Sequence, residues 1–342
     1  MEDFLSKVLY FVDKGYPLPV AYKKAKELSK DEKDSYEEAR QLVLSYYSLH
    51  GKSYRKKVKE FLKDGVKITF PQWLENELKE IYDIEKLKQA FLEKTTWIRV
   101  NTLKADEDKT IKELEKEGIE LERDKDIKYA YKVIKGNIRG TKPFKEFKVI
   151  IQDKASMAVV EALKPEKGDL IFDMTSSPGV KASLIMALTE NQSKLIISDI
   201  DFKRIEREIK FLHDVGVNFD KIQIVHQDST KNSIIKSDKV LLDAPCSSTG
   251  MIGNEPTVLV KLTKERITEL STLQRRLLDN AVAISPFIIY ATCSLLPEEG
   301  ENIVKDYKAK SPLNFGLNEE IGNRFIPYLH QTEGFFVSKI TG

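Results

Sequence analysis

Cysteine is scarce in this chain of 342 residues, which contains only Cys246 and Cys293. A structural disulfide is not expected in a chain of this size that has no export signal. Two cysteines also cannot form a zinc site unaided, and the four histidines show no ligand spacing beside them. Free cysteine is among the most buried residue types, so a pair of inert, buried thiols is the simplest interpretation.

Long apolar runs are missing as well. Residues 1–16 alternate apolar and charged side chains and contain no apolar segment of the kind that a secretory signal needs. No apolar stretch elsewhere is long enough to cross a bilayer. With 41% hydrophobic and 32% charged residues, the composition is typical of a soluble protein. We therefore expect a cytoplasmic protein, a monomer, with neither a membrane partner nor a metal.

An excess of charge of one sign is absent too, because the net charge is only +2. The distribution is more informative, since residues 127–145 contain no acidic side chain. Basic residues recur there beside Tyr129, Tyr131 and Phe144, a mixture that suits phosphate neutralisation and base stacking. A solvated face of a lysine-rich protein would show the same pattern. The candidate nucleic-acid-binding residues are Lys128, Lys132, Lys135, Arg139 and Lys142.

The first half of the chain predicts two small parts. Apolar residues recur with helical spacing in residues 4–12 and 39–47, and Phe70 opens an amphipathic segment that runs to about Leu92. Short β-like runs then flank a predicted helix over residues 107–118. We expect a helical domain over residues 1–93 that binds RNA or a partner, and a small α+β module over residues 94–150.

Residues 151–342 predict an α/β domain in which short apolar strands alternate with helices. This alternation is typical of a mostly parallel, doubly wound sheet with helices on both faces. Right-handed crossovers place the carboxyl ends of all such strands along one edge, where these sheets bind ligands. The predicted strands cover residues 169–173, 195–199, 222–225, 240–243 and 287–290.

Acidic residues lie at or just after the ends of four predicted strands: Asp173, Asp199, Asp228 and Asp243. One such residue is readily explained as a helix cap, but four in series indicate a nucleoside cofactor with ribose hydroxyls. The turn over residues 175–181 leads into a helix whose amides can receive an anionic group. Because this turn lacks the full G-x-G-x-x-G pattern, S-adenosylmethionine is favoured over a dinucleotide.

Both cysteines follow predicted strands on this same edge. Cys246 comes three residues after Asp243, and Cys293 comes three residues after Tyr290. Inert thiols would more often lie within a strand or on the buried face of a helix. The shared position therefore favours a catalytic role for both.

In these motifs the chain resembles the Sun/RsmB/Nop family of S-adenosylmethionine-dependent RNA cytosine-5 methyltransferases. Asp243-Ala244-Pro245-Cys246-Ser247 and Thr292-Cys293-Ser294 are similar to the two cysteine motifs of the family. Residues 99–103, 152–156 and 334–336 match further family motifs, so the resemblance covers about residues 97–339. The helical N-terminus is similar in character to the NusB-like domain of the bacterial ribosomal members.

The resemblance implies a Rossmann-like, seven-stranded methyltransferase sheet, preceded by the small α+β (RRM-like) module and the helical domain. It implies methyl transfer from S-adenosylmethionine to carbon 5 of a cytosine in tRNA or rRNA. Cys293 would attack carbon 6 and Cys246 would assist product release, with Asp243 and Lys181 completing the catalytic group. The implied cofactor-binding residues are Thr175, Ser176, Ser177, Pro178, Gly179, Val180, Lys181, Asp199, Arg204, Asp228 and Asp243.

Three segments depart from the family pattern. Val180 replaces a second glycine, which would permit a positive φ or a close backbone approach. Residues 175–177 replace the usual Cys-Ala-Ala, and residues 284–287 lack paired glycines. A non-catalytic RNA-binding or ribosome-assembly factor with weakened cofactor binding is therefore the alternative function. A nicotinamide-dependent dehydrogenase on a similar sheet would leave the paired cysteine motifs unexplained.

Overall fold

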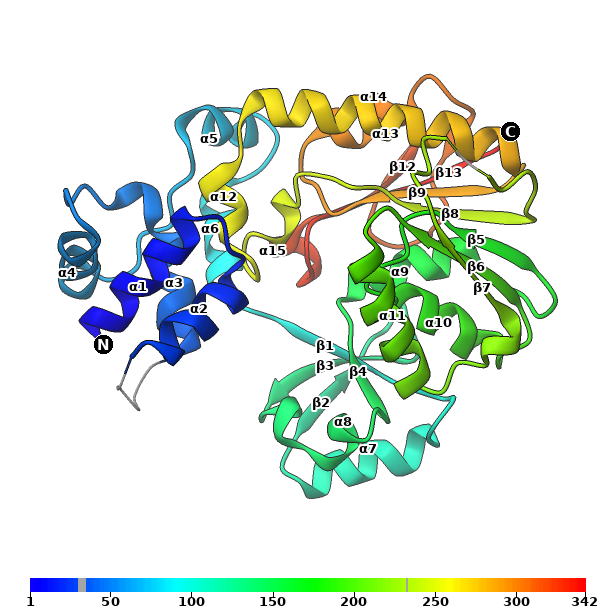
Figure 1. Cartoon of the computed structure of the whole chain (residues 1–342), viewed down its shortest axis with the longest axis horizontal. Helices are drawn as coiled ribbons and strands as arrows, with labels where there is room; N and C mark the ends of the chain where they lie inside the picture. The colour runs from blue at the N-terminus through cyan, green and yellow to red at the C-terminus, as the bar shows by residue number, and fades with distance from the viewer. Residues whose placement is uncertain (30–34, 232) are drawn as a thin grey trace.

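The computed structural model describes residues 1–29, 35–231 and 233–342, and it has three parts (Figure 1). The first part is helical, as predicted. The expected single segment over residues 70–92 is two helices, because the side chain of Asp83 accepts from the amide of Lys86 and starts a new one. The helices are α1 (Glu2–Asp13), α2 (Leu18–Glu27), α3 (Tyr36–Leu44), α4 (Tyr54–Asp64), α5 (Gln72–Lys79) and α6 (Ile84–Leu92).

Arg40 of α3 ties this helical part to the rest of the molecule. Its guanidinium donates to the carbonyl oxygens of Phe91 at 2.9 Å, Leu92 at 2.8 Å and Gly253 at 2.6 Å. Glu37, one turn earlier, neutralises its charge. Because the arginine is fully buried, these carbonyls have no water to replace it. The end of α6 and the turn at residue 253 are therefore fixed against each other.

The second part is the predicted α+β module. Its antiparallel sheet has the order β2-β3-β1-β4, which is that of a split β-α-β unit. The chain passes through β1 (Thr96–Val100), α7 (Glu107–Lys116), β2 (Glu120–Arg123), β3 (Ala130–Lys135), α8 (Lys142–Lys145) and β4 (Val149–Ile151).

Two aromatic residues of this module lie in packed positions. The Tyr131 ring is buried in the module and its hydroxyl bonds to Glu107. The Tyr129 ring packs against the core of the third part, and its hydroxyl donates to Glu161 at 2.6 Å. Both rings are used in packing, which argues against base stacking by them, one of the two interpretations that the sequence left open.

The third part is a nine-stranded mixed sheet with the order β11-β12-β13-β9-β8-β5-β6-β7, in which β10 pairs with β13. Seven strands form the predicted sheet, and the short β10 and β11 extend it. The strands β5, β6, β7, β8 and β9 are paired in parallel, whereas β13 is antiparallel to β9. The bounds are β5 (Leu170–Asp173), β6 (Lys194–Asp199), β7 (Ile222–His226), β8 (Lys239–Asp243), β9 (Ile288–Thr292), β10 (Ala309–Lys310), β11 (Leu317–Glu319), β12 (Gly322–Phe325) and β13 (Phe335–Ile340).

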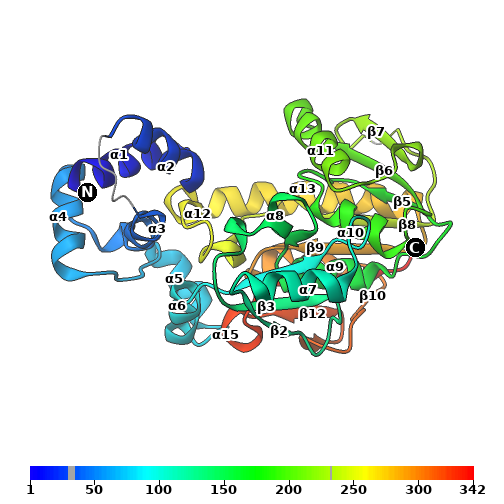
Figure 2. The same cartoon turned by 90° about the horizontal axis from the view of Figure 1, so that it is seen from below.

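Helices cover both faces of this sheet, and the long α13 runs along one of them (Figures 1 and 2). Neighbouring strand residues enter different cores, since Ile171 packs with the helices of one face and Phe172 with α13 on the other. Burial on both faces explains why the strands are apolar throughout. The helices are α9 (Lys154–Leu163), α10 (Val180–Leu188), α11 (Phe202–Asp214), α12 (Thr257–Lys261), α13 (Lys264–Ile284), α14 (Glu301–Val304) and α15 (Pro327–His330).

Arg99 of β1 joins the module to the sheet domain. It is fully buried and donates to Gln152 at 2.6 Å, to the Ser183 hydroxyl at 2.7 Å and to the carbonyl of Val180 at 3.3 Å. The module is thereby held against the first turn of α10. Within the described residues, no helix is long and apolar enough to cross a membrane.

The Arg40→Ala variant tests the connection between the helical part and the sheet domain. We expect it to lower the free energy of unfolding by about 3 kcal/mol, because three buried carbonyls lose their donor. Thermal unfolding followed by circular dichroism measures the change. The control is Arg55→Ala, whose side chain is 72% exposed and lies 3.7 Å from Asp3. Equal melting temperatures for the two variants would contradict the account.

Candidate active site

The two thiols lie together at the carboxyl edge of the parallel strands. β8 and β9 are neighbours in parallel register, with Asp243 beside Ala291. The loops that follow them carry Cys246 and Cys293, whose Sγ atoms are 3.1 Å apart. Both cysteines are free and partly accessible. The sheet therefore brings together two thiols that are 47 residues apart in the sequence.

Lys181 and Asp243 form an ion pair beside the thiols. Lys181 comes from the first turn of α10, and its Nζ lies 2.6 Å from Oδ2 of Asp243. Burial lowers the pKa of Lys181, but the charge and hydrogen bond of Asp243 outweigh burial and raise the pKa above its usual value. Lys181 therefore stays cationic next to the cysteines. All four predicted catalytic residues lie in one cluster.

The hydrogen bond between the thiols makes the two cysteines unequal. Hydrogen bonding to Cys293, then burial, raises the pKa of the Cys246 thiol well above its usual value. Cys246 therefore keeps its proton and can donate it to the sulfur of Cys293. The Cys293 sulfur also lies 3.4 Å from the hydroxyl oxygen of Ser248, so it has polar partners on two sides at the strand edge.

A cavity of about 340 Å³ opens at this edge and includes both cysteines. Six of the predicted cofactor-binding residues line it, and they come from the ends of β5, β6, β7 and β8 and from α11: Thr175, Ser177, Asp199, Arg204, Asp228 and Asp243. Gln227, Ser229 and Ile200 also line it, although they were not among the residues predicted from the sequence. Among the described residues, Ser176, Pro178, Gly179, Val180 and Lys181 do not line this cavity.

In the turn before α10, only Gly179 has a positive φ. Gly179 has a φ of +92°, and a Cβ atom there would lie 2.9 Å from Cγ of Glu208. Val180 is the first residue of α10 and has no positive φ. The valine that replaces the second glycine of the family therefore causes no backbone strain.

Glu208 of α11 supports this turn from behind, and the sequence analysis missed it. Its Oε2 accepts from the hydroxyls of Ser176 at 2.9 Å and Ser177 at 2.7 Å. Its Oε1 is buried and has no hydrogen-bond partner among the described residues. A usable signal existed, because Glu208 falls on the same helical face as the buried Ile205 and Leu212.

Burial raises the pKa of Glu208 to about 7, while the two serine hydroxyls partly offset the effect. Arg204, one turn earlier on α11, donates to the carbonyl of Ser177 at 2.5 Å and lies 3.4 Å from Oδ2 of Asp199. Asp228 differs from Glu208 in that it is exposed and its pKa is lowered, because the amide and hydroxyl of Thr230 donate to its carboxylate. The cavity thus combines three aspartate side chains with a turn held by two residues of α11.

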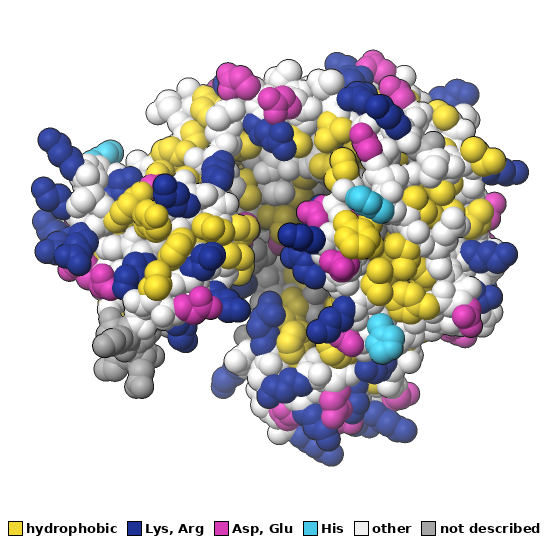
Figure 3. All heavy atoms as spheres, viewed as in Figure 1, with side chains coloured by type: hydrophobic (Ala, Val, Ile, Leu, Met, Phe, Trp, Pro, Cys, Tyr) yellow, Lys and Arg dark blue, Asp and Glu magenta, His cyan; other side chains and the backbone are white. Residues whose placement is uncertain are grey.

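The five predicted nucleic-acid-binding residues all lie on the α+β module but do not converge on one point. Lys132 bonds to Gln331 and borders a separate cavity, whereas Arg139 lies 5.7 Å from the Phe144 ring. Lys128, Lys135 and Lys142 are exposed. Figure 3 shows a deep hollow between the helical part and this module, with Lys and Arg side chains around its rim.

Two family models match the chain. The model of the 16S rRNA methyltransferase RsmB/F matches residues 160–341, which include both thiols and the whole cavity edge. The chain belongs to this family. The RsmF/B-like ferredoxin-like domain model matches residues 70–136, which include most of the α+β module.

Curated relatives of this RsmB/F family chain carry related names. Ribosomal RNA small subunit methyltransferase B of Photorhabdus laumondii is 30% identical over 290 residues, which are 79% of this chain and 66% of that protein. The 26S rRNA (cytosine-C(5))-methyltransferase nsun-1 of Caenorhabditis elegans is 32% identical over 56% of this chain and 33% of its own length. The chain thus spans from a third to about two thirds of the length of these relatives.

All three parts of the chain also occur together, with the same fold, in a solved structure. The crystal structure of PH0851 superposes with a TM-score of 0.82, covering 100% of this chain and 99% of that one. At 23% identity, this match concerns the fold alone. The helical part, the module and the sheet domain therefore form one recurring architecture.

Glu208→Gln tests the buried carboxyl through the pH dependence of stability. Folding raises the pKa of the Glu208 carboxyl from 4.5 to about 7. The stability that the protonated carboxyl contributes is therefore complete below pH 4.5 and is lost as the pH rises through 7. We expect Glu208→Gln to gain stability relative to the wild type between pH 5 and pH 8, by up to about 3 kcal/mol. Urea unfolding at several pH values measures the difference. Glu206→Gln, an exposed change on the same helix, should show no such trend.

Proposed function

We propose that this RsmB/F family protein transfers a methyl group from S-adenosylmethionine to carbon 5 of a cytosine in RNA. The observation that carries the proposal is the pair of thiols 3.1 Å apart, beside the Lys181–Asp243 ion pair and the carboxylate-lined cavity. The rRNA cytosine-5 methyltransferases among the curated relatives support the same reaction and favour rRNA over tRNA as the substrate.

The cavity fits S-adenosylmethionine by its chemistry. Asp199 is buried at the end of β6, where a carboxylate accepts from ribose hydroxyls, and Asp228 is held ionised at the end of β7. These carboxylates also suit the positive charge of a sulfonium. Thr175 and Ser177 add hydroxyls or backbone groups from the turn after β5. When bound, the cofactor supplies the electrophilic methyl group.

Cys293 is the proposed nucleophile. Its thiolate bonds to carbon 6 of the cytosine, and the electrons of the 5,6 double bond move to carbon 5, which becomes able to take the methyl group. Lys181 stabilises the thiolate, and Asp243 positions the base at nitrogen 3, where charge develops during the reaction. The step splits a difficult substitution on an aromatic carbon into two easier ones.

Cys246 is the proposed release residue. After transfer, the proton on carbon 5 must leave before the bond between carbon 6 and sulfur breaks and returns its electron pair to Cys293. Cys246 itself or a water beside it takes that proton. Since the raised pKa keeps a proton on the Cys246 thiol, the water is the more suitable acceptor.

The parts of the chain divide the remaining work in this proposal. Residues 151–342 carry out catalysis, residues 94–150 bind RNA through the five basic residues, and residues 1–93 bind RNA or a partner. The alternative, a non-catalytic RNA-binding factor, depended on weak cofactor binding through Val180. The ordinary helical backbone of Val180 weakens that alternative.

The cysteine variants test the reaction and both thiol roles. Wild-type protein incubated with methyl-labelled S-adenosylmethionine and ribosomal RNA should yield labelled 5-methylcytidine after digestion to nucleosides. We expect Cys293→Ala to lose activity by about 10⁴-fold or more, because the other thiol of the cluster, Cys246, keeps its proton and is a poor nucleophile. Cys246→Ala should accumulate an RNA–protein adduct that survives denaturing electrophoresis.

Cofactor binding by calorimetry serves as the control for both variants and should be unchanged. Labelled 5-methylcytidine from Cys293→Ala would overturn the assignment of the nucleophile. A wild type with no detectable affinity for S-adenosylmethionine would favour the non-catalytic alternative.

Charge reversal tests the basic residues of the module. We expect the triple variant Lys128→Glu, Lys132→Glu and Arg139→Glu to bind RNA at least about tenfold more weakly and with a smaller salt dependence, because phosphate contacts release counterions. Its affinity for S-adenosylmethionine should not change. Reversal of Lys109, Lys112 and Lys116 on α7 gives the same change in net charge and is the control. Equal losses in both variants would show that net charge, and not the predicted residues, sets RNA affinity.

A further inference from the structure

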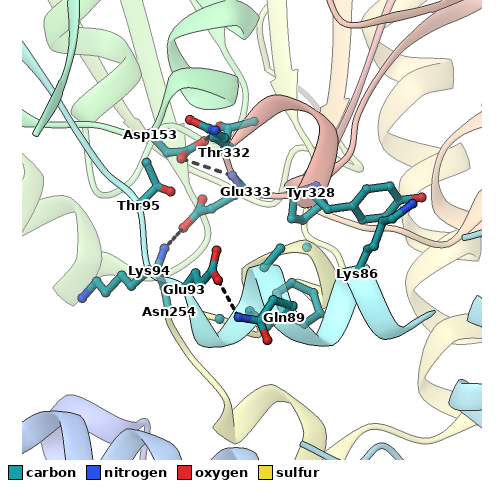
Figure 4. Close-up of a pocket in the computed structure, with 16 residues that line it drawn as sticks. Lys86, Gln89, Glu93, Lys94, Thr95, Asp153, Asn254, Tyr328, Thr332 and Glu333 are labelled. Atoms are coloured by element: carbon teal, nitrogen blue, oxygen red, sulfur yellow. Dashed lines mark hydrogen bonds between the residues drawn. The ribbon is translucent and has the colours of Figure 1, made fainter. Parts of the chain in front are cut away.

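A second cavity, of about 260 Å³, adjoins the loops of the two cysteines (Figure 4). It shares no lining residue with the cavity that contains the thiols. Its walls come from four separate segments: α6 with the residues that follow it, Asp153 before α9, the turn over residues 250–254, and residues 327–333. Neither the proposed reaction nor the proposed cofactor uses this space.

Only one layer of backbone separates this cavity from the nucleophile. The amide of Gly250 donates to the carbonyl of Cys293 at 3.0 Å, and the amide of Gly334 donates to the carbonyl of Gly250 at 3.0 Å. A Cβ atom on Gly250 would lie 1.9 Å from the oxygen of Gly334, so no side chain fits between them. A group in the cavity would therefore lie one layer of backbone from the loop that carries the proposed nucleophile.

Hydrogen bonds from a buried side chain hold two walls of this cavity in place. Arg40 holds the carbonyls of Phe91 and Leu92, at the end of α6, against the carbonyl of Gly253. These hydrogen bonds of a buried guanidinium fix two of the four lining segments against each other. The helical part of the chain is therefore needed to complete a site next to the catalytic loops.

The Glu333 carboxyl, which lines the cavity beside Asn254, is mostly uncharged at neutral pH. Burial, then the charge of Asp153, raises the pKa of Glu333 to about 8, so its carboxyl is protonated. Asn254 donates to Oε1 of Glu333 at 2.7 Å, and the amide of Glu333 donates to Asp153 at 3.2 Å. The Asn254–Glu333 pair thus presents a hydroxyl donor and an amide oxygen acceptor side by side.

Such a pair suits the edge of a nucleobase and not a phosphate. Bases are read by neighbouring donors and acceptors, often from amide and carboxyl side chains, whereas phosphates need cations. Lys94, at one end of the cavity, points away from it in Figure 4, and Lys86 lies at the other end beside Tyr328. Phe91 and Pro327 add apolar wall against which a flat ring can pack.

We propose that this cavity is a nucleotide subsite that takes one unpaired base next to the target cytosine, with Asn254 and Glu333 contacting its edge. The inference rests on the proposed function, because the RNA that enters it is the methyl acceptor. The base must be unstacked from its neighbours to enter, as the target cytosine must be. The cavity thereby contributes to the choice of sequence around the methylated position.

RNA binding tests the subsite without depending on methyl transfer. The probe is a fluorescein-labelled, single-stranded RNA of about ten nucleotides, with one central cytosine and adenines elsewhere. It is compared with the same RNA lacking the base immediately before or immediately after the cytosine. Fluorescence anisotropy should show about tenfold weaker binding of the wild type when one of these two bases is removed.

Two variants test whether the effect arises in this cavity. Ala90→Phe fills the space from α6, and Asn254→Ala removes part of the polar edge. Both should bind the intact RNA about tenfold more weakly and should no longer distinguish it from the abasic RNA. Glu85→Phe, an exposed change on the same helix that does not line the cavity, should behave like the wild type. The affinity for S-adenosylmethionine should be the same in all four proteins.

The outcomes separate the two proposals. If neither missing base weakens binding to the wild type, or if Ala90→Phe and Asn254→Ala still distinguish the RNAs, the subsite is overturned. A wild type that distinguishes them but forms no 5-methylcytidine would overturn the proposed function and leave the subsite standing. A wild type that binds none of these RNAs would overturn both.

Discussion

The parallel pairing of β8 with β9 is the constraint on which the candidate site depends. Because Asp243 lies level with Ala291, the two loops leave the sheet side by side and their thiols meet at 3.1 Å. One intervening strand would separate the loops by a further ~4.8 Å and break the contact. Apolar packing on both faces of the sheet holds this register, so the core of the domain sets the geometry of its edge.

Buried charge then organises the residues around the thiols. Lys181 stays cationic through Asp243, and Arg204 and Glu208 hold the turn after β5 through Ser177. The two serines of this turn need hydroxyl partners in a buried place, and Glu208 supplies an acceptor for both. The departure of this turn from the family pattern thus occurs together with a buried carboxyl, so that the added polar groups are satisfied.

The sequence was most informative about features that depend on neighbouring residues, such as a strand and the residues that follow it. Apolar strands followed by Asp243, Cys246 and Cys293 were sufficient to predict a mostly parallel sheet with both cysteines at one edge, whereas the seven-stranded sheet and the catalytic roles were implied by the family resemblance. Long-range pairing was less accessible: β12 and β13 join β9 in an antiparallel arrangement that no local pattern in the sequence indicates. The role of Tyr131 stayed open, because an aromatic residue among lysines looks the same whether its ring faces RNA or the core.

Contacts between the parts of the chain were also beyond sequence reasoning. Arg40 looks like an ordinary charged residue in an amphipathic helix, yet it is fully buried and bonds to carbonyls near residues 91 and 253. Glu333 precedes a recognisable motif, but its raised pKa depends on Asp153, 180 residues away in the sequence. Such roles depend on contacts between parts of the chain that are far apart in the sequence. No local pattern in a single sequence indicates these contacts.

The most direct test of the account is to locate the covalent bond to RNA. Ribosomal RNA transcribed with 5-fluorocytidine is incubated with the wild type and S-adenosylmethionine, then both are digested and the peptides are analysed by mass spectrometry. Fluorine cannot leave carbon 5 as a proton does, so the adduct should persist. The account predicts a methylated fluorocytidine nucleotide on the peptide that contains Cys293. The same nucleotide on the Cys246 peptide, or methyl transfer to unmodified RNA with no adduct in the fluorinated RNA, would contradict it.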